Sequence, residues 1–345
     1  MKRLKAAVIG AGNIAKTVHA AAYRKLDGVD LVGICDRDVQ RAAAAAAEFG
    51  IPAYFSTHED LLRETSPDLV SVCSPNRFHH EHTLAALAAG AHVLCEKPAA
   101  LSAAEAEAMA AAARNAGKKL AFGFHWRHSA EFLALDGQVR SGAFGRVYAA
   151  RVHALRRRGI PGWGSFTDKA VQGGGPLIDI GIHMLDAALA LMSWPEPAYA
   201  AALSHDAIGR KGGIGLMGPW SGDAFTVEDA LFGFVAFKNG ATLTVETSFA
   251  LNMGDRQVMN VHLFGDSLGA TLNPPAFFGE ASGSLTDTGF PHLAARDAHL
   301  MCVADFVEAC RDGRDPVCAP DQAVAVQRIV DALYRSAETA APAYL

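Results

Sequence analysis

The chain has 345 residues, enough for about two domains of the usual size of roughly 150 residues. Of these residues 50% are hydrophobic and 19% are charged, and the formal net charge is −5. So apolar a composition excludes an intrinsically disordered protein, and the lack of a basic excess argues against nucleic-acid binding. The sequence contains no uninterrupted apolar run of about 18 residues, so we expect no segment that crosses a membrane.

The first residues combine positive charge with a short apolar run, as a signal peptide does. The apolar run stops at Gly10, which is too early for a signal peptide. We therefore interpret Leu4–Ile9 as the first strand of a cytoplasmic protein. The six cysteines form no CxxC pair, and three lie in apolar stretches, so we expect free thiols and no disulfide framework.

Short apolar runs alternate with helical stretches in the first third of the chain. The runs are typical of strands in a covered parallel sheet: Leu4–Ile9, Leu31–Cys35, Leu69–Cys73, His92–Leu94 and Lys119–Phe122. The helices between them have recognisable ends, with Asp38, Ser56 and Ser102 as N-caps and Gly50 and Gly117 as stops. This repeated β-α-β order predicts a doubly wound α/β domain, which we place at residues 1–122.

The pattern changes after about residue 122. Strand-like alternation is found at Gly145–Leu155, Leu231–Phe237, Ala241–Phe249 and Val258–Phe264. The Asn239-Gly240 pair predicts a hairpin with a type I′ turn. Two amphipathic helices close the chain, around Leu300–Cys310 and Val326–Leu333. Residues 123–345 are therefore expected to form an α+β domain with a large, mostly antiparallel sheet.

The segment Gly10-Ala11-Gly12-Asn13-Ile14-Ala15 directly follows the first strand and opens a helix. In this position the glycines allow a tight turn and close approach of a pyrophosphate, which the helix N-terminus then binds. Asp36 ends the second strand, where a carboxylate binds the ribose hydroxyls of NAD and repels the 2′-phosphate of NADP. Arg37 follows and leaves NADP open as an alternative. We expect a dinucleotide site, with NAD favoured.

Three further segments carry chemically useful side chains. Ser74-Pro75-Asn76-Arg77-Phe78-His79 and Glu96-Lys97-Pro98 each follow a predicted strand, where ligands of open α/β sheets bind. A later helix carries Asp179, His183 and Asp186 with the spacing i, i+4, i+7, which places all three on one face.

These motifs, in this order and spacing, resemble the Gfo/Idh/MocA oxidoreductases, the family of glucose–fructose oxidoreductase and inositol dehydrogenase. The resemblance covers essentially the whole chain and rests on the glycine loop, Pro75-Asn76 with His79, Glu96-Lys97-Pro98, and Asp179-x-Gly181-x-His183. It implies a Rossmann domain followed by a domain with a large open sheet that forms oligomer interfaces, hence a homo-oligomer (dimer or tetramer). It also implies NAD(P)-dependent hydride transfer to or from a hydroxyl or ketone of a sugar, sugar derivative or cyclitol.

By this resemblance, Lys97, Asp179 and His183 are the catalytic group. A lysine ammonium stabilises a developing alkoxide, and a histidine near its ordinary pKa of about 6.5 is suited to take the hydroxyl proton. Whether His183 or Lys97 moves the proton stays open. The expected cofactor contacts are Gly10, Gly12, Asn13, Ile14, Asp36, Arg37, Ser74, Asn76, His79, Glu96, Lys97 and Arg127. The expected substrate contacts are Lys97, Arg127, Arg156, Trp163, Lys169, Asp179 and His183.

Several alternatives accompany this interpretation. Trp163 is either a stacking platform for a sugar ring or an anchor in the core. His79 and His82 are spaced like metal ligands, but no third ligand set follows, so we expect no metal. The rival functions are a glycoside hydrolase or lyase that uses tightly bound NAD without net redox change, and a regulatory protein on the same fold.

Overall fold

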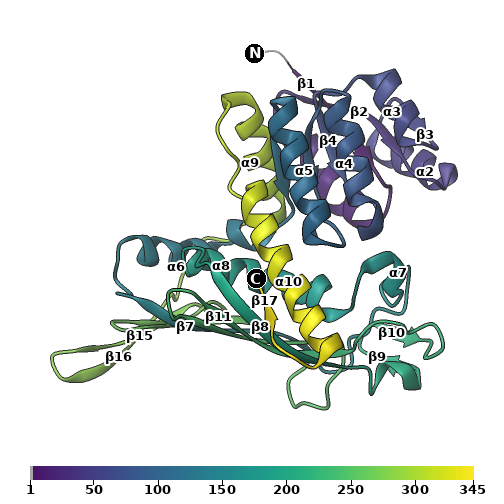
Figure 1. Ribbon diagram of the computed structural model, residues 1–345. Helices are drawn as coiled ribbons and strands as arrows, with labels where there is room; N and C mark the ends of the chain where they lie inside the picture. Colours follow the sequence, from purple (N-terminus) through teal and green to yellow (C-terminus); the bar gives the residue numbers. More distant parts are fainter. Residues whose placement is uncertain (1–2) are drawn as a thin grey trace. The chain divides into compact units, whose positions relative to one another are not determined.

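A computed structural model describes residues 3–345 (Figure 1). Met1 and Lys2, the start of the charged N-terminal segment, lie outside the described residues. The chain forms two compact units: the first runs to His125 and includes Asp297–Val324, and the second comprises Trp126–Arg296 and Ala325–Leu345.

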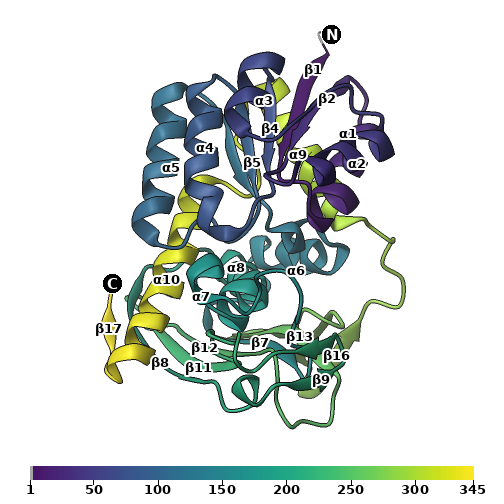
Figure 2. The same cartoon turned by 90° about the vertical axis from the view of Figure 1, so that its right-hand side faces the viewer.

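The first unit is built on a six-stranded parallel sheet of strand order β3-β2-β1-β4-β5-β6. The strands are β1 (Leu4–Ile9), β2 (Val29–Cys35), β3 (Tyr54–Phe55), β4 (Leu69–Val72), β5 (His92–Cys95) and β6 (Leu120–Phe122). Figure 2 shows the sheet between two helix layers, with α4 and α5 on one side and α1 and α9 on the other. The predicted doubly wound fold is confirmed; the two-residue strand β3 is the one that the apolar pattern missed.

The helices of this unit follow the expected boundaries closely. They are a π-helix (Ala15–Ala20), α1 (Ala21–Lys25), α2 (Val39–Phe49), α3 (His58–Thr65), α4 (His79–Ala88), α5 (Ala103–Ala116) and α9 (Ala298–Asp312), with a 3₁₀ turn at Asn76–Phe78. Asp38 and Ser102 cap α2 and α5 as predicted. The predicted cap Ser56 is wrong: Thr57 has the extended backbone of a cap, and its hydroxyl accepts from the amide of Asp60.

Helix α9 packs in the first unit, although we expected everything after residue 122 to belong to the second domain. Val303, Phe306 and Val307 of α9 are buried in one cluster with Ala6 and Val8 of β1. An amphipathic helix shows in its sequence that one face is buried, but not against which sheet.

The second unit contains a nine-stranded sheet of order β16-β15-β14-β13-β7-β12-β11-β8-β17. The strands are β7 (Val147–Arg156), β8 (Pro197–His205), β11 (Ala230–Phe237), β12 (Thr242–Ser248), β13 (Gln257–Gly265), β14 (Gly269–Thr271), β15 (Ala276–Ala281), β16 (Ser284–Gly289) and β17 (Ala343–Tyr344). Strands β7 and β12 pair in parallel and the other neighbours are antiparallel, which confirms a mostly antiparallel sheet. A separate small hairpin joins β9 (Gly213–Gly215) and β10 (Gly218–Trp220).

The hairpin at Asn239-Gly240 is confirmed, but its type I′ turn is wrong. Gly240 has a φ of +82°, whereas Asn239 does not have a positive φ. The Phe237 amide donates to Ala241 and the Gly240 amide to Phe237, so the loop has three residues with one left-handed glycine at its end.

Helices cover one face of this sheet (Figure 1). They are α6 (Ala130–Arg140), α7 (Lys169–Gln172), α8 (Ile182–Leu191) and α10 (Pro320–Thr339), with a π-helix (Leu177–Gly181) leading into α8. The unit also contains a 3₁₀ turn at Gly209–Lys211, just before β9. Within residues 3–345, one helical stretch, Lys169–Leu191, is long and apolar enough to cross a membrane, and 89% of its most apolar window is buried inside the protein. Such burial is what a core helix shows.

Candidate active site

The glycine loop has the geometry that a dinucleotide needs. Gly10 has a φ of +96°, and a Cβ there would lie 2.6 Å from the carbonyl oxygen of Cys73, so only glycine fits the turn. A Cβ on Gly12 would meet nothing within 4 Å, which leaves the backbone open to a ligand. Ala15 is fully buried where the helix begins. The residues present therefore fit NAD or NADP, with Asn13 and Ile14 at the start of the helix.

Asp36 lies where the sequence predicted, at the end of β2, and it also supports the glycine loop. Its carboxylate accepts from the amide of Ala11 at 2.9 Å and from the amide of Asp38 at 2.9 Å. Arg37 is exposed beside it, and Arg41 Nη1 lies 3.6 Å from the Asp36 carboxylate. Arg41 was missed by sequence reasoning, because its place one turn into α2 gives no signal that it reaches back to the strand end.

His79 is buried and connects the two loops that follow β4 and β5. Its Nδ1 lies 2.7 Å from the carbonyl of Pro98 and its Nε2 lies 2.8 Å from the carbonyl of Ser74. Burial lowers the pKa of this imidazole. Ser74, Asn76 and Lys97 lie on these two loops, which the His79 side chain connects. Because the ring is only 1% exposed, its direct contact with a cofactor stays a prediction.

Glu96 ends a chain of buried hydrogen bonds. Tyr23 Oη and His19 Nδ1 each lie 2.8 Å from Ser71 Oγ, and His19 Nε2 lies 2.9 Å from Glu96 Oε1. The Nε2–H of His19 donates to the Glu96 carboxylate, which can only accept. Burial alone would raise the pKa of Glu96, but the hydrogen bond and charge of His19, and then the Lys97 charge, outweigh it and lower this pKa to about 2.

The ionised Glu96 also accepts from the backbone amide of Lys97 at 3.3 Å. It therefore fixes the backbone from which the predicted catalytic lysine projects. His125 and His299 lie nearby as stacked rings 3.8 Å apart between centroids, and burial lowers the pKa of His125 to about 3. Neither these two residues nor His19 was named from the sequence. A histidine on the inner face of a helix looks like any other polar residue until its partners are known.

In the second unit, Asp179 and His183 lie on the helix that begins at Leu177. Asp179 is half-buried within the π-helix, and His183 is 9% exposed at the start of α8. Gly181 between them is required, because a Cβ there would lie 2.5 Å from the Thr247 methyl group on β12. The π-helical turn widens the helix at Asp179, a distortion that is frequent at functional sites.

The arginines predicted from sequence have different environments. The guanidinium of Arg127 is 4% exposed and makes a bidentate ion pair with Asp186, at 2.9 and 2.6 Å, while lying 4.8 Å from the ring of Trp194. In the structure it therefore holds α8, and its contact with cofactor or substrate stays a prediction. Arg156 is close enough to Asp179 for the carboxylate to oppose the lowering of the Arg156 pKa by burial.

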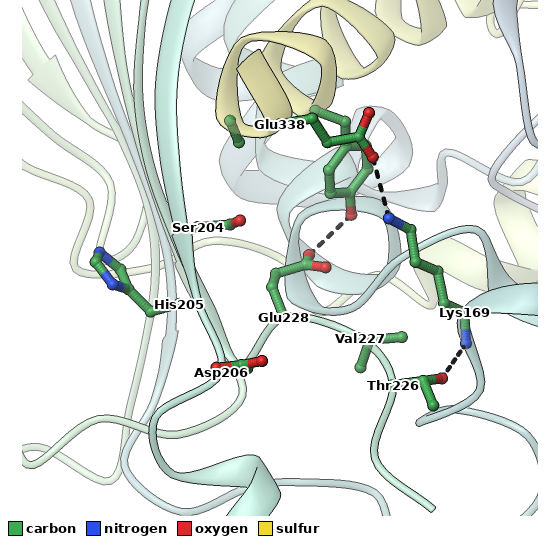
Figure 3. A pocket seen from close by; sticks show the side chains of 10 residues that line it. Lys169, Ser204, His205, Asp206, Thr226, Val227, Glu228 and Glu338 are labelled. Carbon is green, nitrogen blue, oxygen red and sulfur yellow. Dashed lines mark hydrogen bonds and ion pairs between the residues drawn. The ribbon is translucent and has the colours of Figure 1, made fainter. Parts of the chain in front are cut away.

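Trp163 and Lys169 are on the surface of the second unit. Trp163 is 51% exposed and packs edge-on against Phe166, so the alternative of a core anchor is wrong. Lys169 begins α7 and pairs with Glu338 at 3.1 Å across a polar cavity (Figure 3). This cavity is lined by Lys169, Ser204, His205, Asp206, Thr226, Val227, Glu228, Tyr334, Ala337 and Glu338, and not by Asp179 or His183.

The candidate metal ligands are engaged otherwise. The two ring nitrogens of His79 face the carbonyls described above, and His82 lies 2.9 Å from Ser74 Oγ and packs against His58. Within the described residues 3–345, no group of three or more His, Cys, Asp or Glu side chains is arranged to hold a metal ion.

Comparison with known proteins decides the family. Residues 4–124 match the model of the oxidoreductase family with an NAD-binding Rossmann fold, and residues 132–267 match the GFO/IDH/MocA C-terminal domain. The chain belongs to the Gfo/Idh/MocA oxidoreductase family.

Individual relatives extend along the whole chain. It is 43% identical over 336 residues to D-glucoside 3-dehydrogenase of Escherichia coli (strain K12), covering 97% of this chain and 96% of the relative. An oxidoreductase domain protein from Kribbella flavida superposes with a TM-score of 0.88 at 26% identity, covering 100% of this chain and 99% of the other. GenD2 from gentamicin A biosynthesis, solved in complex with NAD, superposes with a TM-score of 0.82 at 26% identity, covering 100% and 97%.

The protein is thus an NAD(P)-dependent oxidoreductase that transfers a hydride between a nicotinamide cofactor and a CH–OH group of a sugar or sugar derivative. The relatives support this interpretation and not the hydrolase or lyase alternative.

Proposed function

We propose that this oxidoreductase oxidises a secondary ring hydroxyl of a D-glucoside, with the hydroxyl on C3 as the first candidate and NAD as the preferred cofactor. The observation that carries the proposal is the 43% identity, over 97% of the chain, to a D-glucoside 3-dehydrogenase. The preference for NAD rests on Asp36 at the end of β2, whose carboxylate disfavours a 2′-phosphate.

The cofactor would be held by the first unit. The amides of the glycine loop and of the following helix would bind the pyrophosphate, and Asp36 the adenosine ribose. Asn13, Ile14, Ser74, Asn76 and His79 are assigned to the same cofactor. The bound nicotinamide supplies the hydride acceptor, and the chain has to supply charge stabilisation, a base and orientation.

Three side chains are assigned to the chemistry. Lys97, on the backbone fixed by Glu96, would stabilise negative charge on the oxygen of the reacting hydroxyl. His183 would accept the hydroxyl proton, with Lys97 as the alternative carrier. Asp179 would bind a neighbouring hydroxyl or orient the imidazole one turn along the helix. Arg156 beside Asp179, exposed Trp163 and Lys169 would contact the sugar.

The test is a panel of alkyl glucosides, free aldoses and inositols with added NAD or NADP, followed at the absorbance of the reduced nicotinamide. The expected result is NADH formation with glucosides and a keto product that keeps its glycosidic bond. Release of the aglycone without net NADH would overturn the proposal, and so would turnover confined to inositols.

We also propose a cytoplasmic homo-oligomer that associates through the large sheet. Leu203, Phe232 and Phe264, 56%, 38% and 39% exposed, lie on the sheet face opposite α8. Apolar side chains gathered on an open sheet face are typical of subunit interfaces. Sedimentation equilibrium should give the mass of a dimer or tetramer, and Phe232→Glu should shift this equilibrium toward the monomer. A monomeric wild type would contradict the proposed oligomer.

The proposed cytoplasmic location is tested by fractionation of the source cells.

A further inference from the structure

A polar cavity of about 230 Å³ lies in the second unit, lined by residues from α7, α10, the end of β8 and the segment before β11 (Figure 3). Among its lining residues, Glu228 and Tyr334 have a second set of contacts. They touch the glycine-rich segment, Gly173–Gly175, from which the helix of Asp179 and His183 starts. The Glu228 carboxylate and the Tyr334 phenol have no part in the proposed chemistry, and these contacts indicate a structural role for them.

Glu228 binds the start of this helix with both carboxylate oxygens. Its Oε2 accepts from the Gly175 amide at 2.9 Å, and its Oε1 accepts from the Leu177 amide at 3.4 Å. Pro176 between them has no amide hydrogen, so Glu228 takes both amide donors that this stretch offers. Acceptor oxygens at a helix N-terminus are favourable, because the first amides of a helix have no partner within it.

Tyr334 fixes the carboxylate in turn. Its hydroxyl donates to Glu228 Oε1 at 2.8 Å, which Figure 3 marks as the dashed line that ends at Glu228. Burial raises the pKa of Tyr334 well above its ordinary value and also raises that of Glu228. The phenol therefore keeps its proton at neutral pH and remains a donor.

The glycines fit this arrangement closely. A Cβ on Gly174 would lie 2.1 Å from Tyr334 Oη, and a Cβ on Gly175 would lie 2.2 Å from the backbone oxygen of Glu228. Both distances are too short for any side chain, so the two glycines let the backbone approach Glu228 and Tyr334. The glycine run thus serves close packing at the start of the helix.

We propose that Glu228, fixed by Tyr334, is a positioning residue that sets where the helix carrying Asp179 and His183 begins. The inference rests on the proposed function, because that function makes Asp179 and His183 on this helix catalytic. Gly175 is directly connected to the site, because its carbonyl accepts from the amide of Asp179 at 3.1 Å. A displacement of Gly175 therefore moves Asp179 directly, and moves His183 through the next turn of the helix.

The experiment compares Glu228→Gln, Glu228→Asp and Tyr334→Phe with Asp206→Asn. Asp206 lines the same cavity but binds Arg210, so its variant is a matched carboxylate-to-amide control. Each variant is assayed for kcat, for KM, for NAD binding and for thermal unfolding. Hydrogen exchange of residues 175–183 is measured in each as well.

Glu228→Gln should lower kcat by about 10- to 100-fold, because a carboxamide cannot accept from both amides and the phenol at full strength. Glu228→Asp should recover part of kcat, and Tyr334→Phe should lose about threefold to tenfold. NAD binding should stay unchanged in all of them, and exchange at residues 175–183 should be faster in Glu228→Gln than in Asp206→Asn.

The outcomes separate this inference from the proposed function. An active wild type with equal kcat in Glu228→Gln and Asp206→Asn overturns the inference and leaves the function standing. A wild type inactive on every sugar tested overturns the function. In that case faster exchange at residues 175–183 in Glu228→Gln supports the anchoring contact, and unchanged exchange overturns it.

Discussion

In the first unit, the residues assigned to the cofactor follow the ends of parallel strands, each within a few positions of a recognisable motif. In the second unit, Asp179 and His183 lie on one helix whose start is held by Glu228, 53 residues from Gly175, and through it by Tyr334, 106 residues further on. Both regions contain a π-helix, at Ala15–Ala20 and at Leu177–Gly181. The cofactor site is thus encoded locally, whereas the catalytic helix depends on distant parts of the chain.

The largest effect is expected for Lys97→Ala. Lys97 is the residue of the first unit that is assigned to the catalytic step, so its variant tests whether this unit does more than bind the cofactor. We expect kcat to fall by about 10²- to 10³-fold, the usual loss when one group that stabilises a developing oxyanion is removed. NAD binding, measured by fluorescence titration, should be retained. Lys25→Ala, an exposed lysine at the end of α1, is the control. A fully active Lys97→Ala would confine the first unit to cofactor binding.

The second unit should show its dependence on distant contacts in its stability. Arg127→Met leaves the fully buried Asp186 without its ion-pair partner, which typically costs about 3–5 kcal/mol. The double variant Arg127→Met/Asp186→Leu should recover part of this loss in denaturant unfolding. Arg140→Met, which removes a 79% exposed arginine from its pair with the half-buried Asp136, is the control. Equal denaturant midpoints of unfolding for Arg127→Met and the control would refute a structural role for the buried Arg127–Asp186 pair.

Buried groups of opposite acid response lie in the two units. Burial lowers the pKa of His82 to about 4, so the unfolded chain takes up its proton first and stability is lost as the pH falls from 6.5 to about 4. Burial raises the pKa of Glu228 and that of Asp229. Their contribution to the free energy of unfolding is therefore lost as the pH rises through the raised pKa values.

His82→Gln should therefore remove about 2 kcal/mol of the decline in unfolding free energy between pH 6.5 and 4. Urea unfolding at several pH values gives this slope, and hydrogen exchange shows in which unit the decline arises. An unchanged slope in the variant would show that His82 is protonated equally in the folded and unfolded chain.

The smallest expected effect tests how local the cofactor site is. Asp36→Ala should weaken NAD binding by about tenfold, or about 1.4 kcal/mol, and NADP binding much less. Asp36 also accepts from the Ala11 amide, so Asp36→Asn, which keeps one acceptor oxygen, separates ribose recognition from support of the loop. Equal weakening of both cofactors by Asp36→Ala would contradict the preference for NAD.

The same contrast explains what could be predicted from the sequence. Strand ends, helix caps and the glycine loop depend on a few neighbouring residues, so the positions of Gly10, Asp36 and Lys97 on the sheet follow from local patterns. Even there, Thr57 replaced Ser56 as the cap, because adjacent hydroxyl residues satisfy the same rule.

Contacts between distant residues could not be predicted in this way. His19 and Glu96 meet across 77 positions, and no spacing rule relates a helix residue to the turn after a later strand. Arg127 has the sequence features of a ligand-binding arginine, yet its partner is Asp186. The large sheet was recognisable from four alternating segments, but β14, β15 and β16 are too short or too exposed to show that alternation.

The return of the chain to the first unit at Asp297–Val324 limits how this protein can be recombined with its relatives. A fragment cut at residue 122 would lack α9 and expose the apolar surface that Phe306 covers. An exchangeable cassette for new sugar specificity is instead an internal insert, residues 126–296. Such a cassette still needs its own α10, because Glu228 inside it is matched to Tyr334 outside it. Chimaeras that transfer both pieces together should keep the catalytic helix in register.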